Sequence, residues 1–142
     1  MAGRFWEASP GRVWVGRLET GDDLVDEIER LCADHDVRAA WVSAIGAVKR
    51  AAFAYYEQDE RRYLELESTE HHEITGFIGN VSIRDDRPFL HAHATFASRT
   101  GSAVGGHLLR GCEVFAAELQ VREMTGVELI RTPDEVTGLA LW

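Results

Sequence analysis

The 142-residue sequence is poor in lysine and has no long apolar segment. Lys49 is the one lysine beside fourteen arginines, and 24 acidic residues against 15 basic ones give a net charge of −9. The arginines are scattered among acids and form no basic tail, which argues against a surface for nucleic acid or anionic membranes. The sequence therefore predicts neither a nucleic-acid nor a membrane partner.

Apolar segments long enough for a membrane or a secretory signal are absent, and cysteine is scarce. No apolar run approaches the ~20 residues needed to cross a bilayer, and the N-terminus lacks the apolar core of a secretory signal. Cys32 and Cys112 lie far apart and are expected to be buried free thiols, which suits a reducing cytoplasm better than a disulfide does. We therefore expect a cytoplasmic protein with one domain over residues 1–142.

One helix is predicted near the N-terminus. Thr20, three residues before Asp23, resembles a capping box. Apolar residues then recur at helical spacing, while acids take the opposite face; the apolar positions are Leu24, Ile28, Leu31 and Cys32. The pattern predicts a helix over residues 22–35.

The rest of the chain is rich in strand patterns joined by short turns. Strands are predicted over residues 12–18, 37–48, 51–56, 61–67, 75–84, 89–96, 112–123 and 127–131, and a second short helix is possible over 104–109. There is no βαβ alternation and no glycine-rich phosphate loop. The prediction is an α+β fold with a mainly antiparallel or mixed sheet of about seven strands and one main helix packed on it.

Three histidines form the most informative motif. His91 and His93 are two residues apart on a predicted strand, so their side chains leave the same face. His107 follows Gly105-Gly106, where the backbone can turn the third imidazole onto the sheet. Three protein ligands with one open position are the arrangement of catalytic zinc, although iron, nickel or copper would also suit. The alternative is a set of hydrogen-bonded or surface histidines.

The other histidines are expected outside this site. His35 falls at the end of the predicted helix, where a cation suits the dipole. His71 and His72 are adjacent, so at most one could join a metal site, and a solvated role is favoured for both.

Glu118 is the candidate acid–base residue. It is expected to share a strand face with Val114, Ala116 and Gln120, where burial would raise its pKa. It could accept a hydrogen bond from a metal-binding imidazole or act as a general base; the alternative is an ordinary edge-strand glutamate. Cys112 is expected to be a core residue rather than a ligand.

These motifs together resemble the plants and prokaryotes conserved domain (PPC domain), and the likeness extends over nearly the whole chain. The central motifs are residues 89–96 (FLHAHATF) and 105–114 (GGHLLRGCEV). Residues 21–24, 43–47 and 75–82 match the family's pattern in the same order.

The resemblance implies a compact unit with a mainly antiparallel sheet, assembled as a homotrimer. Plant members carry AT-hooks that help them bind DNA, but this chain has no R-G-R-P hook. Stand-alone prokaryotic members resemble in fold the acetolactate decarboxylases, zinc enzymes that use an H-x-H and a later histidine. That pattern matches His91, His93 and His107; the rest of the enzyme's site has no residue-by-residue match, so decarboxylation is not carried over.

The histidine motif and the resemblance together leave two candidate functions. The first is a metal-binding protein, with zinc as the expected ion and a small oxygenated molecule as a possible ligand at the open position. Whether such a protein is an enzyme stays open. The alternative is a trimeric DNA-associated or regulatory module without activity, which the charge disfavours because a trimer would carry about three times −9.

Overall fold

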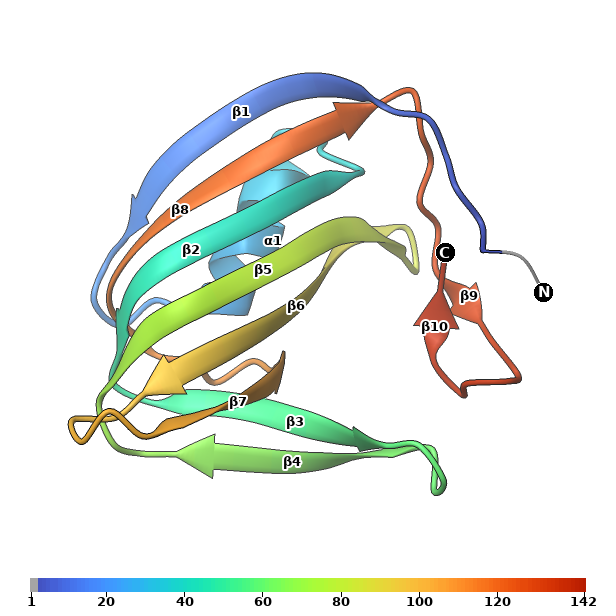
Figure 1. The fold of residues 1–142 in the computed structure, drawn as a ribbon. Helices are drawn as coiled ribbons and strands as arrows, with labels where there is room; N and C mark the ends of the chain where they lie inside the picture. Colours follow the sequence, from blue (N-terminus) through green and yellow to red (C-terminus); the bar gives the residue numbers. More distant parts are fainter. Residues whose placement is uncertain (1–2) are drawn as a thin grey trace.

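Eight strands pair into one curved sheet, and a helix covers one of its faces (Figure 1). The computed structural model describes residues 3–142. The strands of this sheet are β1 (Ser9–Leu18), β2 (Ala40–Val48), β3 (Ala51–Glu57), β4 (Arg62–Ser68), β5 (His72–Arg84), β6 (Arg87–Ala97), β7 (Ala103–Leu108) and β8 (Val114–Thr125). Their spatial order is β1-β8-β2-β5-β6-β7-β3-β4.

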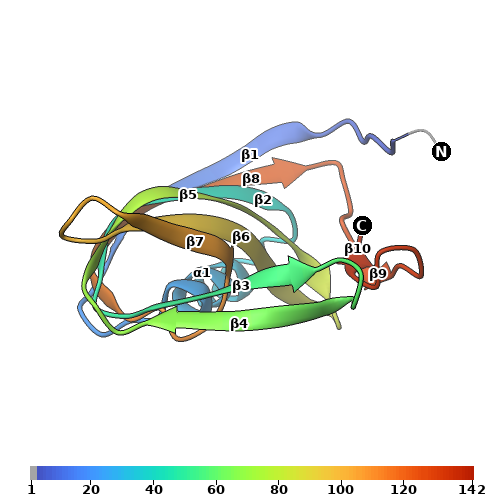
Figure 2. The same cartoon turned by 60° about the horizontal axis from the view of Figure 1, so that its bottom comes forward.

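Every strand pairing in this sheet is antiparallel. The predicted α+β fold is thereby confirmed, with eight strands in the main sheet rather than about seven. The hairpin predicted at 51–56 and 61–67 forms β3 and β4. The sheet curls strongly, so that β3 and β4 come round below β6 and β7 (Figure 2).

The predicted helix is α1 (Leu24–Asp34), and its cap differs from the prediction. Asp23, not Thr20, is the N-cap: one of its carboxylate oxygens accepts from the backbone N–H groups of Val25 and Asp26. Thr20 instead donates its hydroxyl to the carbonyl of Phe115. The helix therefore begins at Leu24, two residues after the predicted start.

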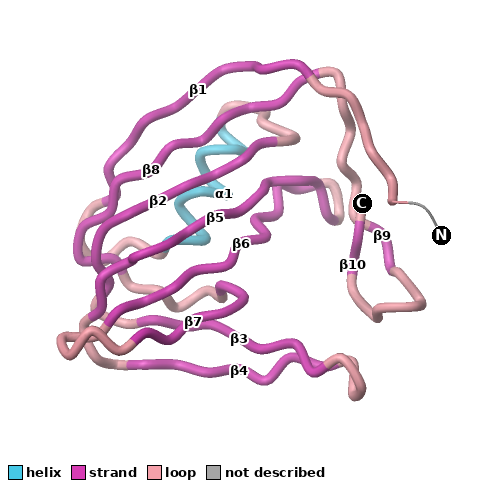
Figure 3. Tube along the Cα trace, in the orientation of Figure 1, coloured by secondary structure: helices cyan, strands magenta, loops and turns pink. Residues whose placement is uncertain are grey.

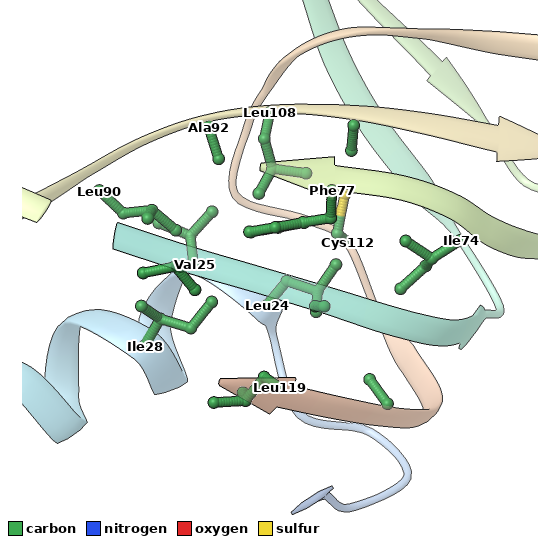
Figure 4. Packing of buried hydrophobic residues seen from close by; sticks show 14 of the residues in the cluster. Leu24, Val25, Ile28, Ile74, Phe77, Leu90, Ala92, Leu108, Cys112 and Leu119 are labelled. Atoms are coloured by element: carbon green, nitrogen blue, oxygen red, sulfur yellow. The ribbon is translucent and has the colours of Figure 1, made fainter. Parts of the chain in front are cut away.

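The core lies between α1 and the sheet face that it covers. Leu24, Ile28 and Cys32 are fully buried along one side of the helix. They pack with apolar side chains of the sheet, among them Phe77 and Leu90 (Figure 4). Cys112 is also buried in this cluster, as predicted. The opposite sheet face is left free of the helix, and the histidines are on that face.

Two predicted elements were wrong. The short helix considered at 104–109 is strand β7, because this segment pairs with β6 on one side and with β3 on the other. Gly105 and Gly106 also disfavour helix. The strand predicted at 127–131 is reduced to an isolated bridge between Ile83 and Ile130.

The C-terminal residues form a small separate hairpin of β9 (Thr132–Pro133) and β10 (Ala140–Leu141), drawn beside the main sheet in Figure 3. The Tyr56 hydroxyl donates to the carbonyl of Thr137 at 2.8 Å and thereby ties this hairpin to β3. Trp142 packs edge-on against Trp6, with ring centroids 5.6 Å apart. Among residues 3–142, no helix is long and apolar enough to cross a membrane.

Candidate metal centre

Strand register brings the three predicted histidines together. His93 on β6 lies directly opposite His107 on β7, and His91 is two residues earlier on β6. Directly opposite residues have Cβ atoms only about 5 Å apart. Alternation along β6 places His91 on the same face as His93, so all three side chains leave the sheet at one place.

Close backbone packing beside Gly105 allows this register. A Cβ atom on Gly105 would lie 2.1 Å from the carbonyl oxygen of Ala94 on β6, so no other residue fits without moving a strand. Gly106 has a φ of +157°, and a Cβ atom there would lie 2.5 Å from the carbonyl oxygen of Ala54 on β3. The two glycines let β7 sit between β6 and β3 and carry His107 to the other histidines.

The three imidazoles have the geometry of a ligand set. One nitrogen from each ring lies within 4.8 Å of the others. The ring centroid of His91 is 5.2 Å from that of His93 and 5.1 Å from that of His107. None of the three rings makes a hydrogen bond within residues 3–142, so their nitrogens are open to an ion. Three imidazoles converging from one face fit a divalent metal such as zinc and leave a position free.

The surroundings keep two of these imidazoles neutral, which is the form that binds metal. Burial, with smaller contributions from Arg131 and His93, lowers the pKa of His91 to about 4. Burial also lowers the pKa of His107 to about 4, and the neighbouring His91, His93 and arginines act in the same direction. The ring of Tyr63 stacks on His107 with centroids 4.8 Å apart.

These pKa values predict how the stability of the metal-free protein depends on pH. An unfolded histidine titrates near 6.5, whereas folded His91 and His107 titrate at about 4. Between these values the unfolded chain binds more protons, so the free energy of unfolding should fall as the pH drops from about 6.5 towards 4. Urea unfolding at pH 7 and pH 5 measures the loss. The double variant His91→Asn, His107→Asn should lose less unfolding free energy between pH 7 and pH 5 than the wild type does. An equal loss in the two proteins would contradict the prediction.

A pocket of about 240 Å³ opens beside His91 and His107. Its other walls come from β3, β4 and the turn between them, from β5 and β6, and from the C-terminal segment. They include Tyr56, Arg61, Tyr63, Arg84, Phe89 and Arg131. Sequence reasoning missed all of these residues. They are up to 75 positions apart in the sequence and belong to no motif (Tyr56 to Arg131), so only the folded sheet brings them together.

Glu118 is not brought to this site within the chain. It lies exposed on β8, and two strands, β2 and β5, separate β8 from β6. Its neighbours across the strands are Arg17 and Ile45. The burial considered for Glu118 does not occur, because the inward positions of this part of β8 are Ala117, Leu119 and Val121, and the alternative of an ordinary strand glutamate agrees with its exposure.

The other histidines also lie outside the cluster. His35 is the C-cap of α1, as its position in the sequence predicted. His71 is exposed. His72 is buried, contrary to the solvated role expected for it, and its Nδ1 lies 2.8 Å from the carbonyl oxygen of Glu70.

The fold and sequence are similar to those of several known proteins. The family model of the Plants and Prokaryotes Conserved (PCC) domain matches residues 6–125. A metal-containing protein from Archaeoglobus fulgidus is 40% identical, with a TM-score of 0.94 and 99% of each chain covered. A plant- and prokaryote-conserved (PPC) protein from Pyrococcus horikoshii is 32% identical, with a TM-score of 0.93, over 99% of this chain and 96% of that one.

More distant likenesses are partial. The bifunctional protein GlmU from a Synechococcus strain is 32% identical over 129 residues, which cover 89% of this chain and 19% of that protein, so the chain spans about a fifth of this relative's length. A Staphylococcus aureus protein described as similar to alpha-acetolactate decarboxylase shares the fold alone, with a TM-score of 0.57 at 18% identity over 83% of this chain and 53% of that one. The match over residues 6–125 and the two archaeal structures show that the chain belongs to the Plants and Prokaryotes Conserved domain family, abbreviated PCC or PPC.

Proposed function

We propose that this protein binds a divalent metal ion, preferentially zinc, through His91, His93 and His107, and that a small oxygenated molecule binds beside the ion. The convergence of the three imidazole nitrogens within 4.8 Å carries the proposal. The 40% identical archaeal protein, which is described as metal-containing, supports it. Three histidines with an open position are a common zinc arrangement, and iron, nickel and copper accept the same donors.

The chemistry of the site follows from its residues. A zinc ion bound there would supply a Lewis acid that polarises a carbonyl or activates water. His91 and His107 are partly buried and line the 240 Å³ pocket, whereas His93 is exposed and is not among its lining residues. Tyr63 packs against His107 and restricts the orientation of that ring. The pocket is of a size for a small metabolite rather than a polymer.

Elemental analysis tests the metal site. Protein purified without chelators or a histidine tag should contain close to one metal ion per chain, and dialysis against a chelator should remove it. Reloading the metal-free protein with zinc, cobalt, nickel or iron(II) then ranks the ions by affinity. Less than one ion per ten chains, together with no zinc uptake at micromolar concentration, would overturn the proposal.

We further propose that the protein assembles as a homotrimer. Exposed apolar side chains lie along the sheet face that carries the histidines, and this supports an assembly surface. They are Val13, Val15, Trp41, Ile45, Ile78 and Phe115. Sedimentation equilibrium should give a mass of about 48 kDa, three times the chain mass of 15.9 kDa. Ile78→Glu should shift the protein towards smaller species, and a wild-type mass near that of one chain would contradict the proposal.

A reducing compartment such as the cytoplasm is the proposed location. Cys32 and Cys112 are buried free thiols, which supports this location. Burial raises the pKa of Cys32 to about 12 and that of Cys112 to about 11. Both thiols therefore stay protonated and take no part in metal binding.

A further inference from the structure

The pocket beside the histidines is lined by positive charge and by no carboxylate. Three arginines, Arg61, Arg84 and Arg131, border it, and none of its lining residues is Asp or Glu. This is unexpected in a chain with a net charge of −9. An anionic group bound in the pocket would balance this local positive charge.

Arg131 is fixed in place by neutral partners. Its Nε donates to the Ser82 hydroxyl at 2.7 Å, its Nη2 to the Asn80 side-chain oxygen at 3.0 Å, and its Nη1 to the carbonyl of Ala140 at 2.9 Å. A guanidinium has five N–H groups, so two remain for another acceptor. Asn80 lies directly opposite His91 in the sheet, which places this guanidinium next to the metal-binding face.

Arg84 approaches the same place from the end of β5. Its guanidinium lies over the ring of Phe89, 3.7 Å from the centroid, and that of Arg131 lies 5.3 Å from the same centroid. Neither arginine forms an ion pair within residues 3–142. Burial and the nearby Arg84 lower the pKa of Arg131, as expected for a guanidinium without a counter-charge.

Seven of the fourteen arginines form an ion pair within residues 3–142, and all seven lie outside this pocket, whereas none of the three pocket arginines does. Arg12 pairs with Glu123 at 2.7 Å, and Arg110 pairs with Asp26 at 2.7 Å. Two neighbouring guanidiniums, one of them half-buried and both without a carboxylate, repel each other, and an anion bound between them would offset that repulsion. From this contrast we infer that Arg131 and Arg84 bind the anionic group, a carboxylate or a phosphate, of the small molecule that occupies the pocket beside the three histidines.

Under this inference the site recognises its ligand through two sets of groups, the arginines and the histidines. The free N–H groups of Arg131 suit the paired oxygens of a carboxylate or phosphate. A second oxygen of the same molecule, from a hydroxyl or a carbonyl, would face the histidines, and for this part the inference rests on the proposed metal site. A pocket of about 240 Å³ suits a small molecule rather than a polymer.

Anion binding tests the inference separately from metal binding. Calorimetric titrations in chloride-free buffer would use two probes, glycolate and inorganic phosphate, with both zinc-loaded and metal-free protein. The variants are Arg131→Met, Arg84→Met and, as a matched loss of charge on the helix, Arg30→Met, which removes the partner of Glu27. Circular dichroism checks the fold of Arg131→Met, since Arg131 also bonds to Ser82 and Asn80; Arg84 is exposed and carries no such role.

We expect at least one probe to bind the zinc-loaded protein, and each pocket variant to weaken that binding by about 10-fold or more. Zinc affinity should change less than about threefold, and Arg30→Met should bind like the wild type. The probe that binds distinguishes a carboxylate ligand from a phosphate ligand. If zinc fails to bind, the proposed function is wrong, whereas anion binding to metal-free protein that is lost in Arg131→Met would still support the arginine site. Binding by neither probe, or equal binding by all variants, would overturn the inference.

Discussion

Replacing His107 with alanine is expected to lower the affinity for zinc on the order of 100-fold or more. Zinc binding to four-ligand protein sites is worth roughly 10–16 kcal/mol, or about 3 kcal/mol for each ligand, and every 1.4 kcal/mol is a factor of about ten in affinity. His107 is one of the three proposed ligands and the one that β7 supplies. Its removal leaves two imidazoles on β6, which also lose the partly buried ring that packs against His91 and Tyr63.

The measurement is a competition titration with a chromophoric zinc chelator, made on the wild type and on His107→Ala. His71→Ala is the matched control, because His71 is exposed and lies outside the cluster. Removing it should leave zinc affinity unchanged. Equal zinc affinity in His107→Ala and the wild type would show that the imidazoles do not form the binding site.

Gly105→Ala is expected to damage both the fold and the metal site. Its Cβ would lie 2.1 Å from the Ala94 carbonyl oxygen and 3.0 Å from the Thr95 Cα, both backbone atoms of β6. Relief requires β7 to move away from β6, which separates His107 from His93. Overpacking of this kind costs about 1–3 kcal/mol of unfolding free energy, and more where backbone must shift. We expect a loss of about 3 kcal/mol and at least a 10-fold loss of zinc affinity.

Gly76→Ala provides the control for this variant. Gly76 also lies in the sheet, on β5, but a Cβ there would meet nothing within 4 Å. Its effect on stability should stay within about 0.5 kcal/mol. Urea unfolding and zinc titration of both variants measure the two effects. A Gly105→Ala protein as stable as the wild type, with unchanged zinc affinity, would mean that the approach of β6 to β7 does not determine the site.

Much of the fold could be predicted because its patterns are local. The apolar spacing of Leu24, Ile28 and Cys32 belongs to one helix, and the hairpin of β3 and β4 joins neighbouring segments. The H-x-H spacing likewise determines that His91 and His93 share a face, whatever surrounds them. His107 could be added because the glycine pair before it lets the backbone turn the third imidazole onto the sheet.

What could not be predicted depends on the order of the strands. Nothing in the sequence around Glu118 shows that β2 and β5 would lie between its strand and the histidines. Similarly, Arg131 reaches the pocket because the chain after β8 bonds to the end of β5, where the backbone N–H of Arg131 donates to the carbonyl of Ile83. Such long-range pairings leave no periodic signal in a single sequence.

The central claim is that His91, His93 and His107 hold one metal ion. A crystal of protein purified without chelators, with diffraction data collected above and below the zinc absorption edge, tests it most directly. The account predicts one anomalous peak bonded to a nitrogen of each of the three imidazoles, at about 2.0–2.1 Å if the ion is zinc. It also predicts a further coordination position open towards the pocket that Arg131 and Arg84 line. A zinc-soaked crystal with no peak at the three imidazoles, or with the ion bound elsewhere, would contradict it.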